Sequence, residues 1–432
     1  MIMKIAWFTP FNKKSAIGKY SKLATDELSK YVSVDIFVFE RDNLLETKNR
    51  TIFYTVGEDV LNKLNNYDVI VYNMGDYAPY HEKIFEILRK KRGIVIIHDT
   101  TLLGFFYGYY SRNTSIVDFY NLYSKLYCES PENAFSRYMS KESSKFGFMD
   151  YITRFCCGVI VHSDFHADII KKVYNGPLCR IYFPFSQECI SCNDAVGEIQ
   201  KDAAKVNMLT VGYINKNKRV FEVVQAIGKS DSLKNAIIYH VIGSKENVEY
   251  INQIEYLINK YDLHNTVKLI GYVDDNTLAA YYRDADVLCN LRNPALEGAS
   301  WSLVEQMSLG KPIIVSDNGF YSEIPGECVF KISLENEEEE LAKTLLHIIR
   351  NKDVLSSKGE SAKKFVDENF NQGKYAKSFM KFIERIVYGK PIEALMNKLT
   401  YHMNQFRINS DMKIVNNISE HVEALFAKRT HV

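Results

Sequence analysis

The sequence predicts an α/β protein with two doubly wound domains that face each other across a cleft, followed by a helical extension. Short, continuous apolar runs alternate with longer segments of helical periodicity, which is typical of parallel strands buried on both faces. The alternation stops in a polar stretch near the middle of the chain and then begins again, so the pattern occurs twice. A length of 432 residues agrees with two or three domains of ordinary size.

The first domain is predicted over residues 1–188. Its expected strands are the apolar runs Lys4–Phe8, Val34–Phe39, Val69–Tyr72, Ile94–Ile97, Gly158–His162 and Arg180–Phe183. Helical stretches such as Lys19–Lys30 and Glu82–Lys91 lie between them. Residues 189–205 are polar, lose the alternation, and are predicted to form a linker.

The second domain is predicted over residues 206–374. Its expected strands are Asn207–Val211, Ile237–Ile242, Thr266–Leu269, Asp286–Asn290, Pro312–Val315 and Cys328–Phe330. Helices such as Val248–Tyr261 and Thr277–Arg283 fit between these strands. Because ligands of doubly wound domains bind at the carboxyl ends of the strands, we expect the site in the cleft between the two domains.

The chain after residue 335 is predicted to be mostly helical, and residues 390–432 form a helical extension with two amphipathic stripes. One stripe contains Ile392, Leu395, Met396, Leu399, Met403 and Phe406, and the other Met412, Val415, Ile418, Val422 and Phe426. These apolar faces must be covered, either by the chain's own domain or by self-association. A chain that ends at Gly389, stays folded and forms a smaller assembly would favour self-association.

Composition narrows the function classes. The 54 basic and 53 acidic residues leave a net charge of +1, which argues against a dedicated nucleic-acid binder. No apolar run approaches the roughly 20 residues that span a bilayer. Eight cysteines in so long a chain indicate reduced thiols in the cytoplasm, and the lone pair Cys189 and Cys192 is too weak a motif to predict a metal.

The segment Asn293–Pro312 has the strongest pattern for chemistry. A strand ends before it, and a turn with small residues leads into a helix near Ser300 and Trp301. The free N–H groups and positive dipole end of such a helix suit a diphosphate. Glu297 precedes the helix and Glu305 lies about a turn into it, so both carboxylates can face one pocket.

Glu297 and Glu305, with the residues that follow them to Val315, resemble the Glu-x7-Glu signature of retaining, nucleotide-sugar-dependent glycosyltransferases of family 4, the group 1 glycosyltransferases. These proteins have the GT-B fold of two Rossmann-like domains. The chain keeps Glu297, Gly298, Glu305, Met307, Gly310 and Pro312 of the usual pattern, and departs from it at Ala299, Ser300 and Trp301. Further segments are similar to a bacterial subgroup that builds surface polysaccharides: Leu291–Pro294, Ser316–Phe320, Glu323–Pro325, Tyr72–Gly75 and His98–Asp99.

The resemblance implies a donor site in the second domain. Glu297 would hold the hydroxyls of the donor sugar, and Glu305 the nucleotide ribose. Lys218 would face the donor diphosphate, with Arg219 compensating for Tyr213, which stands where the family usually has an arginine. Ser300 and Trp301 at the helix start would add N–H groups to the departing diphosphate. Gly243 and Tyr272 match loops that border the nucleotide.

Other implied site residues belong to the first domain. Gly18 follows the first strand and opens a helix, where its backbone can approach the phosphate or the acceptor; a plain turn is an equally good interpretation. His98 and Asp99 end a buried strand; His98 would touch the transferred sugar or the acceptor, and Asp99 would orient the acceptor hydroxyl. The catalytic candidates are therefore Glu297, His98 and Asp99. His162 ends another strand and is a further cleft candidate. The helix over 375–389 would cross back to the first domain.

The expected function is transfer of a sugar, with retention, from a nucleotide sugar to a glycan, glycolipid or protein acceptor in bacterial glycan assembly, with no metal or other cofactor. Two alternatives stay open: a catalytically silent GT-B protein that binds an active transferase, or an epimerase or phosphorylase of the same architecture. No nucleic-acid partner is expected.

Residues Leu102–Tyr127 are rich in aromatic side chains, and two interpretations of them stay open. They form either an acceptor or membrane-interface surface or the core of the first domain. Basic residues of the same domain could meet anionic lipid, which keeps a peripheral position at the inner membrane face open. They are Lys83, Arg89, Lys90, Lys91 and Arg92.

Overall fold

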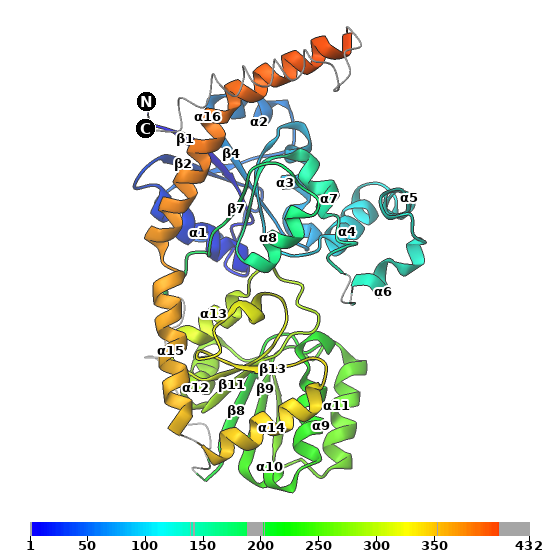
Figure 1. The fold of residues 1–432 in the computed structure, drawn as a ribbon, viewed down its shortest axis with the longest axis vertical. Coiled ribbons are helices and arrows are strands. Elements are labelled where there is room, and N and C mark those ends of the chain that lie inside the picture. Colours follow the sequence, from blue (N-terminus) through cyan, green and yellow to red (C-terminus); the bar gives the residue numbers. More distant parts are fainter. Residues whose placement is uncertain are drawn as a thin grey trace, which may run out of the picture. The chain divides into compact units, whose positions relative to one another are not determined.

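A computed structural model describes residues 2–138, 140, 143–187, 202, 204–351 and 353–405. The chain divides into two compact units, Met1–Met380 and Lys381–Val432. The first unit contains both predicted α/β domains, each built on its own parallel sheet (Figure 1). Most of the predicted linker over 189–205 lies outside the described residues.

In the described chain, the first sheet has seven parallel strands in the order β3-β2-β1-β4-β5-β6-β7. They are β1 (Lys4–Phe8), β2 (Ser33–Val38), β3 (Arg50–Phe53), β4 (Val69–Met74), β5 (Gly93–Ile97), β6 (Cys156–Val161) and β7 (Leu178–Arg180). The central strands β4 and β5 are buried along their whole length, as continuous apolar runs predict. The carboxyl ends of β1, β4, β5 and β6 meet at one edge of the sheet.

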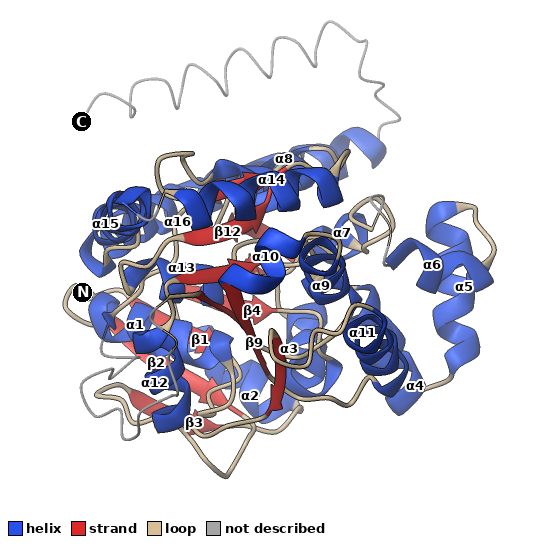
Figure 2. Ribbon diagram, turned by 90° about the horizontal axis from the view of Figure 1, so that it is seen from below, coloured by secondary structure: helices blue, strands red, loops and turns tan. Residues whose placement is uncertain are grey.

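Helices surround this sheet (Figure 2). They are α1 (Ala16–Leu28), α2 (Glu58–Lys63), α3 (Ala78–Lys90), α4 (Leu103–Asn113), α5 (Ile116–Tyr127), α6 (Ala134–Tyr138), α7 (Met149–Ile152) and α8 (Asp164–Lys171), with short 3-10 turns η1 (Leu64–Asn66), η2 (Pro131–Asn133) and η3 (Thr153–Phe155). Helix α1 begins at Ser15, whose hydroxyl accepts a hydrogen bond from the Gly18 N–H at 3.1 Å. Helix α8 begins in the same way at Ser163.

The second sheet has six parallel strands in the described chain, in the order β10-β9-β8-β11-β12-β13. They are β8 (Val206–Val211), β9 (Ile237–Ile242), β10 (Val267–Gly271), β11 (Val287–Asn290), β12 (Ile313–Ser316) and β13 (Phe330–Ile332). Its helices are α9 (Val220–Gly228), α10 (Asp231–Ala236), α11 (Val248–Lys260), α12 (Asp275–Asp284), α13 (Trp301–Ser308) and α14 (Glu337–Arg350), with turns η6 (Lys216–Lys218) and η7 (Gly319–Glu323). The predicted doubly wound architecture is therefore confirmed.

Three edge strands differ from the sequence prediction. Strand β3 was not predicted, because three of its four side chains are exposed and the apolar pattern is broken. Strand β7 lies earlier than the predicted Arg180–Phe183, and β13 lies later than the predicted Cys328–Phe330. Phe183 is buried against Trp301, so its apolar character reflects packing rather than sheet pairing. Edge strands carry weaker patterns because only one neighbour fixes their register.

Helices α15 (Asp353–Asn369) and α16 (Gln372–Gln405) follow the second domain. Helix α16 continues through Pro391, where the sequence predicts the start of a separate helix. The predicted second stripe, Met412–Phe426, lies outside the described residues. Within the first unit, the Tyr375 and Tyr20 hydroxyls are 2.5 Å apart, and Phe379 packs on Trp7. The start of α16 thus contacts the first domain, as the resemblance implies.

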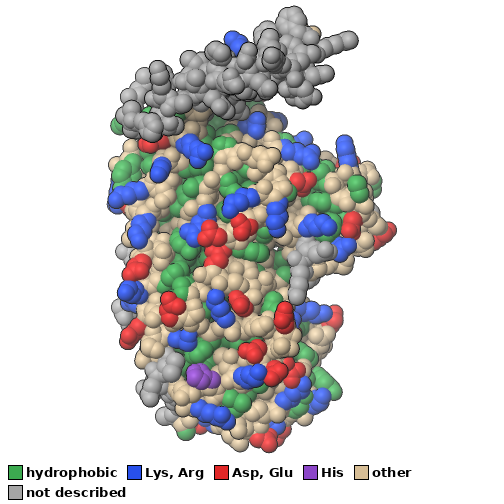
Figure 3. Space-filling view, viewed as in Figure 1, with side chains coloured by type: hydrophobic (Ala, Val, Ile, Leu, Met, Phe, Trp, Pro, Cys, Tyr) green, Lys and Arg blue, Asp and Glu red, His purple; other side chains and the backbone are tan. Residues whose placement is uncertain are grey.

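The aromatic stretch Leu102–Tyr127 supplies mainly core side chains. Phe105, Phe106, Phe119 and Tyr123 are fully buried and belong to the core of the first domain. The core interpretation therefore accounts for these four. The described helices include none with enough length and apolar character to cross a membrane. Basic and acidic side chains are interspersed on the face shown in Figure 3, in keeping with the balanced charge.

Candidate active site

The loop after β5 and the loop after β11 are joined by main-chain hydrogen bonds. The Gly298 N–H donates to the His98 carbonyl at 2.8 Å, and the Thr100 N–H donates to the Leu296 carbonyl at 2.7 Å. These bonds pair Asp99 with Glu297 as in a short antiparallel bridge. Three predicted site residues from opposite halves of the chain, His98, Asp99 and Glu297, therefore lie together.

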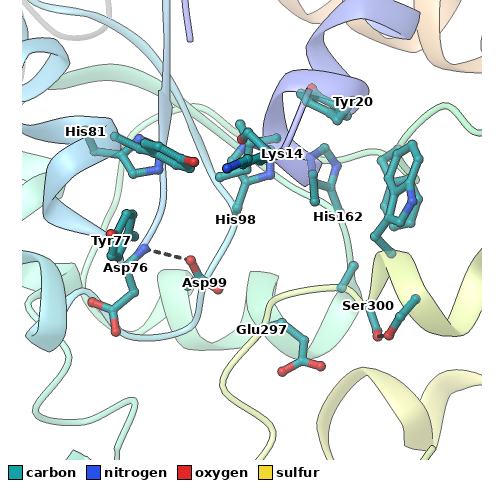
Figure 4. A pocket seen from close by; sticks show the side chains of 18 residues that line it. Lys14, Tyr20, Asp76, Tyr77, His81, His98, Asp99, His162, Glu297 and Ser300 are labelled. Carbon is teal, nitrogen blue, oxygen red and sulfur yellow. Dashed lines mark hydrogen bonds between the residues drawn. The ribbon is translucent and has the colours of Figure 1, made fainter. Parts of the chain in front are cut away.

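A cavity of about 520 Å³ opens beside this junction. Figure 4 shows Tyr20, His98 and His162 grouped together, with Glu297 and Ser300 coming from the second domain and Asp99 near the middle. The lining residues are Lys14, Ser15, Ala16, Ile17, Tyr20, Asp76, Tyr77, Tyr80, His81, His98, Asp99, His162, Phe183, Glu297, Ala299, Ser300, Trp301 and Ser302. Most come from segments that follow strands, as expected for a doubly wound fold.

The histidines of the cavity are held neutral. Burial lowers the pKa of His81 and His162 to about 4, and it lowers that of His98 well below the usual value, with nearby His162 adding to the effect. The Asn73 amide donates to the Phe8 carbonyl at 3.0 Å, so its oxygen faces the Nε2 atom of His98 at 3.0 Å. His98 therefore carries its hydrogen on Nε2 and has a lone pair on Nδ1.

Two buried carboxyl groups lie at the same edge of the first sheet. The Asp99 Oδ2 atom accepts a hydrogen bond from the Asp76 N–H at 2.7 Å, and the Asp76 Oδ1 atom accepts from the Phe105 N–H, in the first turn of α4, at 2.7 Å. Burial raises the pKa of Asp99 to about 7, and the charge of Glu297 adds to the rise. Burial and the charge of Asp99 raise the pKa of Asp76 well above its usual range. Asp99 can thus gain or lose a proton near neutral pH.

Glu297 is held in its charged form. Burial acts to raise its pKa, but the Arg292 guanidinium, a hydrogen bond from Tyr321 and the Lys218 ammonium together hold the pKa below the usual value. The Arg292 Nε atom lies 3.2 Å from Glu297 Oε1, and the Tyr321 hydroxyl donates to the same oxygen at 2.5 Å. A carboxylate fixed in this way can accept hydrogen bonds from a bound polar ligand.

The loop after β8 brings Lys218 close to Glu297. The Lys218 Nζ atom donates to the Val211 carbonyl at 3.1 Å and crosses directly over Gly212, where a Cβ would lie only 2.7 Å away. Gly243 closes the same corner, since a Cβ there would meet the Gly212 carbonyl oxygen at 1.9 Å and its φ is +156°. Burial, followed by the charge of Arg292, lowers the pKa of Lys218 well below its usual range.

The prediction that the Arg219 side chain joins Lys218 at the donor site differs from the structure. Its Nε atom donates to both carboxylate oxygens of Glu337, at 2.9 and 3.1 Å, and its Nη1 atom lies 2.8 Å from Glu222. Its backbone is left-handed, with φ of 56°, which ends η6 and turns the chain into α9. The guanidinium therefore pairs with acidic side chains on α9 and α14. This differs from the prediction that Arg219 contacts the donor diphosphate.

Helix α13 begins at Ser300, whose hydroxyl accepts a hydrogen bond from the Leu303 N–H at 3.3 Å. The Trp301 indole stacks on Phe183, with ring centroids 5.4 Å apart. Burial raises the pKa of Glu305, one turn into the helix, while the charge of Lys19 opposes the rise. The Glu297–Glu305 pair thus brackets a helix N-terminus, as the spacing predicts.

Six predicted residues, Gly18, Lys218, Arg219, Gly243, Tyr272 and Glu305, are not among the lining residues of the cavity. Gly18 sits in the first turn of α1, where a Cβ would lie 3.0 Å from the Pro10 and Asn12 carbonyl oxygens, so its role there is close packing while Ser15–Ile17 line the cavity. Tyr272 follows β10 and is 84% exposed. Its neighbour Gly271 accepts a hydrogen bond from the Gly243 N–H at 2.9 Å, which places Tyr272 in a loop beside that of Gly243.

Sequence reasoning gave no role to several residues of the site. Arg292, Tyr321 and Asp76 contact the predicted residues, and His166 abuts Gly298, where a Cβ would lie 2.2 Å from the His166 Nδ1 atom. Arg292 follows the predicted strand Asp286–Asn290 by two residues, and Asp76 follows the predicted strand Val69–Tyr72 by four because β4 extends to Met74; a position after a strand is a signal that could have identified both. Within the described residues, no cluster of three or more His, Cys, Asp or Glu side chains could hold a metal ion.

Parts of the chain are similar in sequence to known proteins. Residues 195–366 match the family described as Glycosyl transferases group 1. An uncharacterized glycosyltransferase of Methanocaldococcus jannaschii is 30% identical over 190 residues, which are 44% of this chain and 47% of that protein. Sucrose synthase 6 of Oryza sativa is 25% identical over 172 residues, 33% of this chain and 20% of that protein. The chain thus spans less than half the length of these curated relatives.

The fold of both domains is similar to that of solved GT-B structures. Sucrose-phosphate synthase from Thermosynechococcus elongatus has a TM-score of 0.64 at 17% identity, covering 90% of this chain and 100% of that one. HepE from Anabaena, solved with UDP, has a TM-score of 0.59 at 15% identity, covering 89% and 100%. WaaG, a glycosyltransferase involved in lipopolysaccharide biosynthesis, has a TM-score of 0.55 at 15% identity, covering 88% and 99%.

The fold is the GT-B fold of two Rossmann-like domains. The stretch that matches the family described as Glycosyl transferases group 1, residues 195–366, includes Lys218, Glu297 and Glu305.

Proposed function

We propose that this protein is a glycosyltransferase that moves a sugar from a nucleoside diphosphate sugar to an acceptor hydroxyl, with retention at the anomeric carbon. The observation that carries the proposal is the meeting of Glu297 and the α13 N-terminus with His98 and Asp99 around one cavity. Glu297 and α13 lie in the segment that matches the group 1 glycosyltransferases, and His98 and Asp99 lie on the facing domain. HepE, a structural neighbour, was solved with UDP and glucose, which makes UDP the first donor nucleotide to test.

Each group has a defined part in this reaction. Glu297 accepts hydrogen bonds from the donor sugar, and Glu305 binds the ribose. Lys218 and the first N–H groups of α13 stabilise the departing diphosphate. The bond from the anomeric carbon to the diphosphate oxygen breaks while the acceptor oxygen bonds to the same face. The acceptor proton passes to the diphosphate. Because these protein groups neutralise the leaving group, we propose that no metal is required, and activity in EDTA tests this point.

The neutral His98 and the partly ionised Asp99 face the acceptor. Either the Nδ1 lone pair of His98 or a carboxylate oxygen of Asp99 can accept a hydrogen bond from the acceptor hydroxyl before its proton passes to the diphosphate. An acceptor hydroxyl held in this way is oriented before the transfer, which lowers the entropic part of the barrier. A glycan of bacterial surface assembly remains the proposed acceptor class, and glycolipid and protein acceptors are tested beside it.

The test is a donor and product screen with matched variants. Purified protein is offered UDP-, GDP-, ADP-, CMP- and dTDP-sugars, and binding is followed by thermal shift and calorimetry. With the active donor, the Glu297→Gln variant should lose most of the turnover of the parent chain. Its unfolding temperature should stay within a few degrees of that of the parent chain. Product without added acceptor would indicate an epimerase, and a requirement for free phosphate would indicate a phosphorylase. Absence of any nucleotide binding and any turnover would refute the proposal.

A further inference from the structure

Arg292 occupies a position from which it can reach the donor diphosphate. It follows β11, and β11 lies beside β8, whose carboxyl end leads to the loop of Lys218. Because neighbouring parallel strands end at the same edge of the sheet, Arg292 and Lys218 come to one corner of the cleft. The two loops contact each other directly, because the Asn293 N–H donates to the Asn217 carbonyl at 2.9 Å, and the charge of Arg292 contributes to the lowered pKa of Lys218.

The contacts of Arg292 leave one guanidinium nitrogen available. Its Nε atom lies 3.2 Å from Glu297 Oε1, and its Nη1 atom donates to the Leu291 carbonyl at 2.7 Å. The backbone N–H is held by the Ser316 hydroxyl at 3.0 Å, so the side chain starts from a fixed point. Among the described residues, no hydrogen bond engages Nη2. The residue is 5% exposed, and a guanidinium in such surroundings is costly unless it is fully paired.

This corner holds little negative charge for its basic groups. Arg292 and Lys218 share one carboxylate, Glu297, and burial together with the charge of Arg292 lowers the pKa of Lys218 well below its usual range. A bound anion would favour the charged form of Lys218 in this poorly hydrated corner. A diphosphate brings the missing negative charge, and a guanidinium can bind its oxygens in two places at once.

We propose that Arg292 is the second cation of the donor diphosphate site and supplies the guanidinium that the sequence places at Arg219. This inference rests on the proposed function, because it assumes a nucleoside diphosphate donor. Arg219 is occupied by Glu337 and Glu222, and Tyr213 has no charge, so neither competes for this role. Arg292 also bonds Glu297 and so links the diphosphate to the carboxylate that holds the donor sugar.

The experiment measures the affinity of UDP, GDP, ADP, CDP and dTDP for the full chain by calorimetry, and the tightest of them serves as the probe. Arg292→Gln should weaken binding of that nucleotide by about 10- to 100-fold, the usual worth of a hydrogen bond to a charged group. Lys216→Gln removes one positive charge from the exposed part of the neighbouring loop and should leave the affinity within about twofold. Glu297→Gln removes the competing carboxylate and should leave nucleotide binding unchanged or stronger.

Two outcomes would overturn the inference. Equal affinity of Arg292→Gln and the parent chain would show that Arg292 takes no part in binding, while the proposed function would stand on the nucleotide binding itself. Parallel losses in Arg292→Gln and Glu297→Gln would show that Arg292 only positions Glu297. If Arg292→Gln is unstable because Glu297 is left unpaired, the double variant Arg292→Gln/Glu297→Gln is compared with Glu297→Gln, and the same 10- to 100-fold loss is expected. No binding of any of the five nucleotides by the parent chain would refute the proposed function first.

Discussion

Replacing Asp99 with asparagine should stabilise the protein, by an amount that grows with pH. The folded state raises the pKa of Asp99 from 3.8 to about 7, while the unfolded chain keeps the usual value. The folded protein therefore holds the proton more tightly, and stability is lost as the pH rises from about 4 to 7. At 1.36 kcal/mol per pKa unit, this loss reaches about 4 kcal/mol at pH 8 and about 2 kcal/mol at pH 5.

Asparagine keeps the group neutral at every pH. Its side-chain oxygen can still accept the hydrogen bond from the Asp76 N–H that now ends on Asp99 Oδ2. The free energy of unfolding of Asp99→Asn and the parent chain is measured by urea denaturation at pH 5 and pH 8. The gain in the variant should be about 2 kcal/mol larger at pH 8. A gain that is equal at the two pH values, or a loss at pH 8, would refute the electrostatic argument.

The same titration should appear in the kinetics. If ionised Asp99 orients the acceptor hydroxyl, kcat/KM should fall about tenfold between pH 8 and pH 6, since the ionised fraction of a group with a pKa near 7 falls by that amount. The histidines of the cavity do not titrate in this range. The Asp99→Asn variant should have a lower kcat/KM, and its kcat/KM should not fall between pH 8 and pH 6. An unchanged acid limb in the variant would assign it to another group.

Three further predictions test other parts of the site. Lys218→Met should reduce kcat at least 100-fold through lost stabilisation of the diphosphate, whereas Lys216→Met should keep it, and equal effects would contradict the assignment. Gly298→Ala should lower the free energy of unfolding by about 1 to 3 kcal/mol, since its Cβ would lie 2.2 Å from His166 Nδ1, and adding His166→Ala should recover much of this loss. Burial lowers the pKa of His166 to about 3, so the unfolded chain binds a proton at His166 first and the free energy of unfolding falls below about pH 6.5. Urea denaturation should show that the free energy of unfolding lost between pH 7 and pH 5 is about 2 kcal/mol smaller in His166→Leu than in the parent chain. An equal loss would show that His166 does not titrate.

The sequence by itself determined the architecture and brought attention to part of the cavity lining. Continuous apolar runs predicted the central strands, because strands buried on both faces need them, and the restart of the pattern predicted two domains. The spacing of Glu297 and Glu305 predicted that they lie on either side of a helix start, because this depends on helix geometry over a few residues, and of the two only Glu297 is among the lining residues of the cavity. His98 and Asp99 were predicted from their place at a strand end, which is also a local property.

Only the tertiary structure decided which acidic side chains pair with the two arginines. Arg219 and Arg292 look alike in the sequence as arginines that follow strands, but Glu337, more than 100 residues later, pairs with the first, while Glu297 pairs with the second. The neutral state of His98 and the raised pKa of Asp99 likewise depend on burial, which no local pattern shows. Glu337 comes from a distant segment and is brought to Arg219 by packing, so the sequence without the fold could not show that Arg219 is paired there.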